Sequence, residues 1–336
     1  MSVTPRKLGQ DLVYPVGLGC MNFSHGYGPP LDEADAIHLL HEAIDLGYNF
    51  LDTATLYGFG NNERIIGKAL AEKRHTFLLA SKCVLMFEGE KRYIDGRPET
   101  ITAACDASLK RLGMDVIDLY YMHRPDPNVP IEDSIGAMAD LVAAGKIRMI
   151  GLSEMGAGLL RRAAAVHPIA AMQSEYSLIT RNPEIAVIEA CRELGTAFVP
   201  FSPVGRGLLA NSPPTPDSYH KRDMRSYFPR YVEPNYSANL ALLETAREIA
   251  ADLNCTIAQL AIAWTMAQGD DMLPIPGTTN LQHLKDNFHA AEIVLEPYIL
   301  ARLNETFTPE AVSGARYAPA MQKSVDTERF PFEMTE

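Results

Sequence analysis

The sequence has few cysteines, and their spacing excludes two kinds of small stabilised domain. The 336 residues contain five cysteines, at positions 20, 83, 105, 191 and 255, and no two of them form a CxxC pair. A disulfide framework and a standard zinc site are both incompatible with this number and spacing. The cysteine usage is typical of a reducing compartment.

Positive charge and long apolar runs are also scarce. Lysine and arginine total 30 against 42 aspartates and glutamates, and the net charge of −12 argues against non-specific binding to nucleic acid or an anionic membrane. No run of about 18 apolar residues occurs, and the first residues, MSVTPRKLGQDL, contain no apolar signal core. We therefore expect a soluble, cytoplasmic protein without a membrane or nucleic-acid partner.

Short apolar runs alternate along the chain with segments of helical periodicity. Hydrophobic residues make up 47% of the sequence, which excludes an intrinsically disordered protein. The apolar runs predict eight strands, at 16–18, 49–52, 77–82, 116–122, 147–153, 170–174, 196–201 and 272–275. The periodic segments predict helices at 32–46, 62–73, 97–112, 131–144, 157–166, 183–194, 239–253, 256–268 and 281–291.

This alternation is typical of parallel sheets built from right-handed βαβ units. Eight such units predict an α/β protein with the (β/α)8 TIM-barrel fold, formed as one domain over residues 1–336. The rival architecture is a doubly wound open sheet, which usually carries GxGxxG after its first strand. Here residues 17–21 read GLGCM, lack the third glycine and open no helix, so the barrel is favoured.

Three stretches are longer than a barrel needs. They are the loops at 86–98 and 203–234 and the irregular C-terminal tail at 304–336. Both loops follow strand ends, and active sites of barrels lie at that face. We therefore expect the two loops to be active-site loops, although plain surface insertion is the alternative.

Polar residues follow three of the predicted strands. Asp52, Lys82 and His123 each stand at a strand end, and Tyr57 lies in the loop after Asp52. Each alone has an ordinary structural explanation, such as a helix N-cap for the aspartate. Together they supply a phenol acid, an ammonium that lowers the phenol pKa, a carboxylate that fixes the ammonium, and an imidazole donor. That set suits protonation of a carbonyl oxygen while another group attacks the carbon.

The motifs around these residues resemble the aldo-keto reductase superfamily, in particular its bacterial and fungal aldehyde, aryl-alcohol and pyridoxal reductases. The resemblance covers about residues 10–290, in the family's order and spacing. The motifs are DTATLYG at 52–58 followed by Asn62, Glu63 and Gly67; SK at 81–82; LYYMHRP at 119–125; GKIR at 145–148; IGLS at 150–153; QSEYS at 173–177; PFSP at 200–203; IPGTT at 275–279; and DN at 286–287.

The resemblance implies an NADP(H)-dependent oxidoreductase that reduces a small aldehyde or ketone to an alcohol. It implies that Tyr57 is the general acid, that Lys82 and Asp52 lower its pKa, and that His123 orients the carbonyl. The hydride would come from C4 of NADPH, with NADH as a possible substitute and no metal. The family binds its cofactor without a Rossmann fold, which accounts for the missing GxGxxG.

The resemblance also implies a set of cofactor-binding residues. Phe201 corresponds to the residue that stacks on the nicotinamide, and Ser153 and Gln173 correspond to carboxamide ligands. Glu154 stands where the superfamily often has Asn, and a carboxylate can accept but not donate a hydrogen bond. The other implied contacts are Gly19, Cys20 and Met21 near the ribose and pyrophosphate; Ser202, Pro203, Val204, Gly205, Arg206 and Gly207 along the pyrophosphate; and Ile275, Gly277, Thr278, Thr279, His283, Asp286 and Asn287 at the adenosine end.

Two other functions are compatible with a barrel of this kind. One is a nicotinamide-sensing regulatory subunit with little turnover, similar to the potassium-channel β-subunits. The other is a lyase that uses Lys82 as a Schiff base, which requires a desolvated lysine without a carboxylate neighbour. Asp52 argues against the lyase, and the intact set of four residues favours turnover.

The adenosine end generates a prediction about cofactor choice. Relatives usually have Lys or Arg at the positions of Asn280 and His283, and a 2′-phosphate is bound best by fixed cations. We expect Asn280→Arg or His283→Arg to tighten NADPH and to leave NADH nearly unchanged in a fluorescence titration. Equal effects on both cofactors would show that the 2′-phosphate lies elsewhere.

Overall fold

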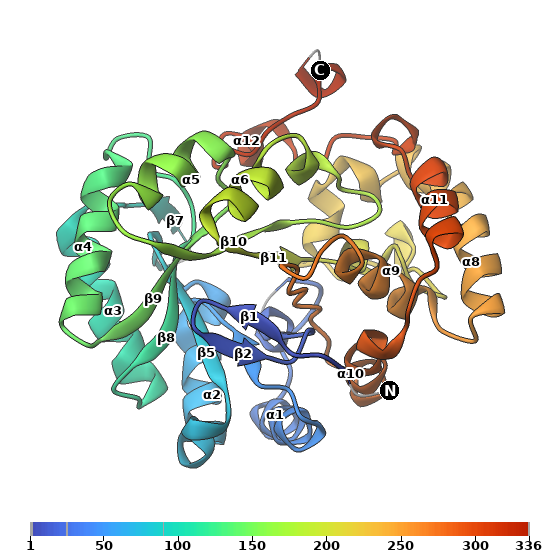
Figure 1. The fold of residues 1–336 in the computed structure, drawn as a ribbon. Coiled ribbons are helices and arrows are strands. Elements are labelled where there is room, and N and C mark those ends of the chain that lie inside the picture. Colours follow the sequence, from blue (N-terminus) through green and yellow to red (C-terminus); the bar gives the residue numbers. More distant parts are fainter. Residues whose placement is uncertain (1–2, 25, 90, 335–336) are drawn as a thin grey trace.

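The computed structural model describes residues 3–24, 26–89 and 91–334. Its centre is a parallel sheet of seven strands in the order β11-β10-β9-β8-β5-β4-β3, which is chain order around a barrel. Helices surround this sheet on the outside (Figure 1). The strands are β3 (Leu18–Gly19), β4 (Phe50–Asp52), β5 (Leu78–Cys83), β8 (Ile117–Met122), β9 (Ile147–Ser153), β10 (Ile169–Glu175) and β11 (Ala197–Phe201).

The eighth predicted strand closes the barrel although it forms little regular ladder. On one side Leu273 and Ile275 donate backbone hydrogen bonds to β11. On the other side Gly17, just before β3, and Gly19 within it donate to the carbonyls of Pro274 and Pro276. Proline has no N–H, so every second ladder position in this segment lacks a donor. The carbonyls and the two remaining N–H groups still join β11 to β3. The predicted (β/α)8 barrel is confirmed.

The helices lie close to the predicted segments. Gly47 ends α1 in the left-handed conformation at φ 114°, and its N–H returns to the last turn. The side chains of Thr256 and Gln259 form a reciprocal capping box at the start of α9. The helices are α1 (Glu33–Leu46), α2 (Asn61–Leu70), α3 (Pro98–Leu112), α4 (Ile131–Ala143), α5 (Ala157–Ala164), α6 (Val187–Leu194), α7 (Asn235–Ala241), α8 (Leu243–Asp252), α9 (Ile257–Met266), α10 (Leu281–His289), α11 (Pro297–Thr306) and α12 (Pro319–Gln322).

Several elements differ from the sequence predictions. The loop at 86–98 contains an antiparallel hairpin of β6 (Leu85–Glu88) and β7 (Lys91–Ile94). The segment at 239–253 divides into α7 and α8, and α11 was not predicted. The predicted loop at 203–234 is irregular, as expected, and contains short 3-10 turns. These pieces are short or lack strong periodicity, which explains why the pattern did not reveal them.

The core has two layers, one inside the barrel and one between barrel and helices. Phe50, Leu119 and Tyr121 belong to the inner cluster, whereas Tyr120 packs in the outer cluster. The unpredicted hairpin of β1 (Arg6–Leu8) and β2 (Asp11–Val13) adds Leu8 and Val13 to the inner cluster, and it crosses one end of the barrel in Figure 1. Because that end is covered, the opposite end, at the strand carboxyl termini, is left for a site.

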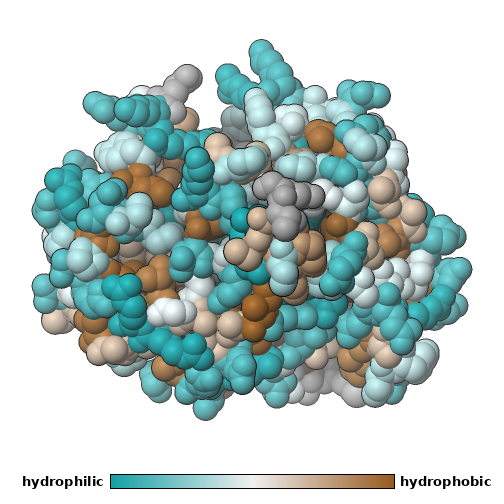
Figure 2. All heavy atoms as spheres, turned by 90° about the horizontal axis from the view of Figure 1, so that it is seen from above, coloured by the Kyte–Doolittle hydropathy of each residue, from teal (hydrophilic) through white to brown (hydrophobic). Residues whose placement is uncertain are grey.

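Figure 2 shows a face that is largely hydrophilic, with small separate hydrophobic spots. Within the described residues, no single helix is long and apolar enough to span a membrane. The α7–α8 stretch passes that test only together with α9, to which it is bent by 90°.

Two helical glycines give a matched test of the helix packing. A Cβ on Gly67 in α2 would collide with the backbone carbonyl group of Leu112 at the end of α3, whereas one on Gly136 in α4 would meet nothing. We expect Gly67→Ala to lower the free energy of unfolding by about 1–3 kcal/mol. The control Gly136→Ala should raise it by about 0.5–1 kcal/mol, because alanine favours the helix. Urea unfolding of both variants measures the difference; equal effects would contradict the α2–α3 contact.

Candidate active site

The four polar residues predicted at strand ends meet at the open end of the barrel. Asp52 ends β4, Lys82 lies in β5, His123 follows β8, and Tyr57 lies in the turn after β4. All four are buried: Asp52 is 2% exposed, Lys82 1%, His123 6% and Tyr57 9%. The parallel register brings these strand ends to one edge because β4, β5 and β8 are neighbours in the sheet.

Lys82 joins the carboxylate to the phenol. Its Nζ forms an ion pair with Asp52, donates to the carbonyl of Thr53 at 2.9 Å and lies 3.2 Å from the Tyr57 hydroxyl. The second Asp52 oxygen accepts from Gln173 Nε2 at 2.7 Å. The ammonium is therefore held by two oxygens and has one direction left, toward the phenol.

The electrostatics of the phenol correct one expectation from the sequence. Burial is the largest influence on Tyr57 and raises its pKa, while Lys82 lowers it and Asp52 raises it, so the net pKa lies above the ordinary value. For Lys82, burial lowers the pKa, but the charges of Asp52 and Tyr57 outweigh burial and raise it. Lys82 is thus a cation, and Tyr57 carries its proton at neutral pH, as a general acid must.

His123 is a neutral imidazole next to this chain. Burial, followed by the charges of Arg124 and Lys82, places its pKa well below the ordinary range. Its ring lies 6.1 Å from the Tyr57 ring, nearly perpendicular to it. Nδ1 is buried and has no hydrogen-bond partner among the described residues. A neutral imidazole carries one N–H, so one of the two ring nitrogens can donate a hydrogen bond.

The predicted nicotinamide residues lie at neighbouring strand ends. Ser153 of β9 pairs in register with Gln173 of β10, and Glu175 of β10 pairs with Phe201 of β11. Ser153 and Gln173 are buried, and Gln173 uses its amide N–H on Asp52, which leaves its carbonyl oxygen for another donor. The three strands thus place Ser153, Gln173 and Phe201 along one edge.

Glu154 and Arg206, both predicted to contact the cofactor, are paired with protein groups. Both Glu154 carboxylate oxygens accept from Arg316, at 2.7 and 2.6 Å, and Glu154 is 0% exposed. Arg206 donates to Glu175 at 2.6 Å and stacks near Phe228, with 4.6 Å from its guanidinium carbon to the ring centre. Neither side chain is therefore disposed as a free cofactor ligand in this structure.

The loop after β11 has an unusual backbone. Ser202, Gly205, Arg206 and Gly207 all have positive φ, at 52°, 53°, 52° and 90°. The backbone N–H groups of Gly205 and Gly207 donate to the carbonyls of Ser202 and Val204, at 2.9 and 3.0 Å, so the turn is held by its own hydrogen bonds. Pro203 and Val204 lie in this turn between β11 and the 3-10 helix Gly205–Gly207.

The other predicted cofactor residues lie along the seam where the barrel closes. A Cβ on Gly19 would lie 2.7 Å from the carbonyl oxygen of Ile275, and one on Gly277 would lie 2.8 Å from that of Gly19. Cys20 donates its backbone N–H to the Asp52 carbonyl at 2.9 Å, and Met21 starts a 3-10 turn beside it. Glycines at this seam keep the two backbones in contact.

Thr278, Thr279 and the start of α10 follow this seam. The Asn280 side chain caps α10 by accepting from the His283 N–H at 3.0 Å, and Asn280 N–H donates to Thr278 at 3.0 Å. Asn287 is buried, and Asp286 accepts from Gln282 on the exposed face. Because Asn280→Arg would remove the helix cap, His283→Arg is the cleaner variant for the cofactor prediction.

Sequence reasoning missed Arg316 and Tyr317, which come from the tail and reach Glu154. No pattern in the tail signals them, since periodicity reports helices and strands and not the partner of a buried carboxylate. It also missed how Asn62 ties the site, by accepting from Thr53 at 2.6 Å and donating to the Cys20 carbonyl at 2.9 Å. Asn62 was identified only as a motif residue.

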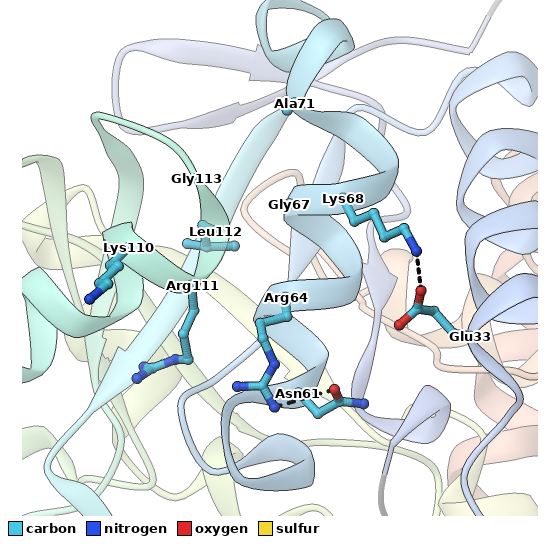
Figure 3. Close-up of a pocket in the computed structure, with 10 residues that line it drawn as sticks. All are labelled: Glu33, Asn61, Arg64, Gly67, Lys68, Ala71, Lys110, Arg111, Leu112 and Gly113. Carbon is cyan, nitrogen blue, oxygen red and sulfur yellow. Dashed lines mark hydrogen bonds and ion pairs between the residues drawn. The ribbon is translucent and has the colours of Figure 1, made fainter.

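A surface hollow elsewhere on the molecule is separate from this site. It lies between α2 and the end of α3, where Lys68 pairs with Glu33 and Arg64 contacts Asn61 (Figure 3). None of the four strand-end residues lines it. Among the described residues, no group of three or more His, Cys, Asp or Glu is placed to hold a metal ion.

A (β/α)8 barrel with a buried Asp–Lys–Tyr chain and a neutral histidine at its open end defines an acid–base enzyme acting at a carbonyl or alcohol oxygen. The chain belongs to the aldo/keto reductase family, whose model matches residues 15–307.

Individual relatives extend this match over the whole chain. The sequence is 42% identical to "Aldo-keto reductase yakc [NADP(+)]" of Schizosaccharomyces pombe, over 98% of this chain and 100% of that protein. The structure resembles the glycerol dehydrogenase AKR11B4 of Gluconobacter oxydans, with a TM-score of 0.85, 26% identity and 95% and 100% of the two chains covered. It also resembles AKR11C1 of Bacillus halodurans, with a TM-score of 0.78, 28% identity and 95% and 99% covered.

The buried neutral histidine predicts a pH effect on stability. His123 stays unprotonated in the folded state, whereas in the unfolded chain it binds a proton below its ordinary pKa of about 6.5. The unfolded state therefore gains more protons as the pH falls, and the folded protein loses stability below that pKa. One such group accounts for about 1 kcal/mol at about pH 5.5.

We expect His123→Gln to lose this contribution. The free energy of unfolding should fall less between pH 8 and about pH 5.5 in the variant than in the parent, by about 1 kcal/mol. Denaturant unfolding at both pH values measures it. The control is the replacement of His167, a partly exposed residue whose ring contacts the neighbouring Pro168 carbonyl at 2.9 Å, and it should give the same pH dependence as the parent. Parallel pH curves for His123→Gln and the parent would contradict a buried neutral imidazole.

Proposed function

We propose that this protein is an NADP(H)-dependent carbonyl reductase that converts aldehydes or ketones to alcohols, with Tyr57 as general acid. The observation that carries the proposal is the 3.2 Å contact between Lys82 Nζ and the Tyr57 hydroxyl, with Asp52 behind the lysine. The S. pombe relative's NADP(+) name supports the cofactor, and so does a Klebsiella pneumoniae aldo-keto reductase solved with NADPH, 25% identical at a TM-score of 0.72.

The residues at the open end suit an extended dinucleotide. The close approach of Gly19 and Gly277 keeps side chains out of the seam, and Gly205 and Gly207 would let a pyrophosphate come close to the backbone of the turn after β11. Gln173 retains a carbonyl oxygen for the carboxamide N–H groups, and Ser153 a hydroxyl. Phe201 offers a ring on the third strand. When bound, a reduced nicotinamide supplies a hydride.

The protein's own groups then manage the oxygen and its proton. The His123 ring and the Tyr57 hydroxyl hold the carbonyl oxygen, and both are neutral donors at neutral pH. As negative charge develops on that oxygen, Tyr57 releases its proton to it. The Lys82 ammonium stabilises the phenolate left behind, and Asp52 keeps the ammonium in place. In alcohol oxidation the same groups act in reverse order.

The surroundings of the phenol favour an apolar carbonyl compound. Tyr57 forms a small buried cluster with Ala54 and Leu56, against which Leu85 and Phe87 of the β6 strand pack. Phe59 adds a second ring 5.0 Å from Phe87. Apolar walls of this kind exclude water and leave the reacting oxygen to the few polar groups.

Replacing the phenol gives the most direct test of this proposal. Tyr57→Phe removes one hydroxyl, so folding and NADPH binding should survive while reduction falls by about 10²–10⁴-fold. The reduction rate of Lys82→Met should fall by a comparable factor, because the phenolate loses the cation that stabilises it. Asp52→Asn should be milder, and His123→Ala should reduce turnover with cofactor affinity retained. Steady-state turnover of a reactive aldehyde beside NADPH fluorescence titration measures both quantities.

Tyr120→Phe is the matched control. Tyr120 is a fully buried phenol on β8, and it packs in the outer cluster away from the site. The Tyr120→Phe enzyme should reduce the aldehyde at the parent rate. A Tyr57→Phe enzyme that also works at the parent rate would overturn the mechanism.

A further inference from the structure

Two buried carboxylates stand side by side at the ends of the strands that carry the nicotinamide residues. Glu154 directly follows Ser153 of β9, and Glu175 ends β10 two residues after Gln173. Glu154 is 0% exposed and Glu175 2%. Two unpaired carboxylates buried next to each other would repel each other strongly. Their hydrogen-bond and ion-pair partners therefore determine whether the two strand ends keep this arrangement.

Arg316 from the C-terminal tail supplies the charge that both glutamates share. Its guanidinium donates to both oxygens of Glu154, at 2.7 and 2.6 Å, and to Glu175 at 3.1 Å. Tyr317 adds a donor to Glu154 at 3.2 Å. Although burial raises the pKa of Glu175, the charges of Arg206 and Arg316 lower it to about 2. Glu175 is therefore ionised, and the side chains of both glutamates are tied to the tail.

Glu154 has a strained backbone conformation, which its contacts with β10 and with Arg316 hold in place. It has a positive φ of 57°, its N–H donates to the Gln173 carbonyl at 2.9 Å, and one of its carboxylate oxygens accepts from the Glu175 N–H at 3.0 Å. It thus links β9 to β10 by main chain and side chain at the level of Ser153 and Gln173. A left-handed non-glycine residue persists only where its surroundings determine it.

The tail also holds this corner by its backbone. Asp326 N–H donates to the Glu154 carbonyl at 3.0 Å, and Glu328 accepts from the Ala157 N–H at 2.7 Å. Figure 1 shows the tail, with α12, lying along α5 and α6. The Arg316 guanidinium carbon lies 6.0 Å from the centre of the Phe201 ring, so the same arginine contacts all three strand ends of the proposed nicotinamide site.

We propose that Arg316 is a positioning residue for the nicotinamide end of the cofactor site, and that Glu154 is its anchor and not a cofactor ligand. This rests on the proposed function, since it concerns how Ser153, Gln173 and Phe201 are held for NADPH. The proposed adenosine end contains Thr278, His283 and Asn287, and there Thr278 and the His283 N–H bond to Asn280. Arg316 instead bonds to Glu154 and Glu175 at the other end, so it should act on one end of the cofactor only.

The test compares two ligands that differ by the nicotinamide. Arg316→Met should weaken NADPH by about tenfold, equivalent to about 1.4 kcal/mol, and change 2′-phospho-ADP-ribose by less than about twofold. Arg316→Lys should recover part of the loss, because one ammonium can serve one carboxylate. Arg302→Met is the control, since Arg302 pairs with Glu248 on the surface and should change neither ligand. Equal weakening of both ligands, or no weakening of NADPH, would overturn the proposal.

Glu154→Gln distinguishes an anchor for Arg316 from a direct cofactor ligand. It also replaces Arg316→Met if that variant does not fold, because in Glu154→Gln Arg316 is still paired with Glu175. Glutamine adds a donor, so NADPH should tighten if this side chain contacts the carboxamide directly. The anchor role predicts weaker NADPH with 2′-phospho-ADP-ribose unchanged. A parent protein that does not bind NADPH, whether or not it binds 2′-phospho-ADP-ribose, would contradict the proposed function itself. Equal NADPH binding by parent and variant would contradict only the role of Arg316 and Glu154.

Discussion

The site depends on keeping one lysine charged in a place that is almost free of water. Lys82 is 1% exposed, and an isolated ammonium there would lose its proton. Asp52 prevents this, and Gln173 in turn holds the second oxygen of Asp52. The barrel makes this possible because parallel neighbouring strands bring residues far apart in sequence to one edge. Lys82 and its counter-ion Asp52 are thus fixed by the sheet, and Tyr57 lies in the short turn that follows β4.

The same end of the barrel contains a second buried charge network. Glu154 and Glu175 face Arg206 and Arg316, so two carboxylates from two strand ends meet one guanidinium group from a loop and one from the tail. Removing one member of a buried pair leaves an uncompensated charge, which is why such networks specify a single arrangement strongly. The C-terminal tail is therefore part of the site's architecture, although it lies beyond the residues 15–307 that match the family.

The sequence predicted the parts of this protein that follow from periodicity and from strand ends. Asp52, Lys82 and His123 could be placed together because each follows a buried run, and the barrel follows from eight such runs. The last run forms little ladder because Pro274 and Pro276 lack N–H groups, yet its hydrophobic pattern still located it. Two features that depend on tertiary contact could not be predicted. They are the β1–β2 hairpin and the pairing of Glu154 with Arg316, which lie 162 residues apart in the sequence. The raised pKa of Tyr57 was not predicted either. Burial raises this pKa by more than Lys82 lowers it, and a sequence motif does not report burial.

The central claim is that a tyrosine with a raised pKa, and not the histidine, donates the proton. The pH dependence of the single-turnover reduction rate tests this most directly. Since Tyr57 holds its proton through neutral pH, the rate should stay constant from about pH 6 to about pH 9 and fall only as the phenol ionises. A rate that instead falls with an apparent pKa of about 6.5, and that loses this fall in His123→Gln, would make His123 the acid and contradict the account.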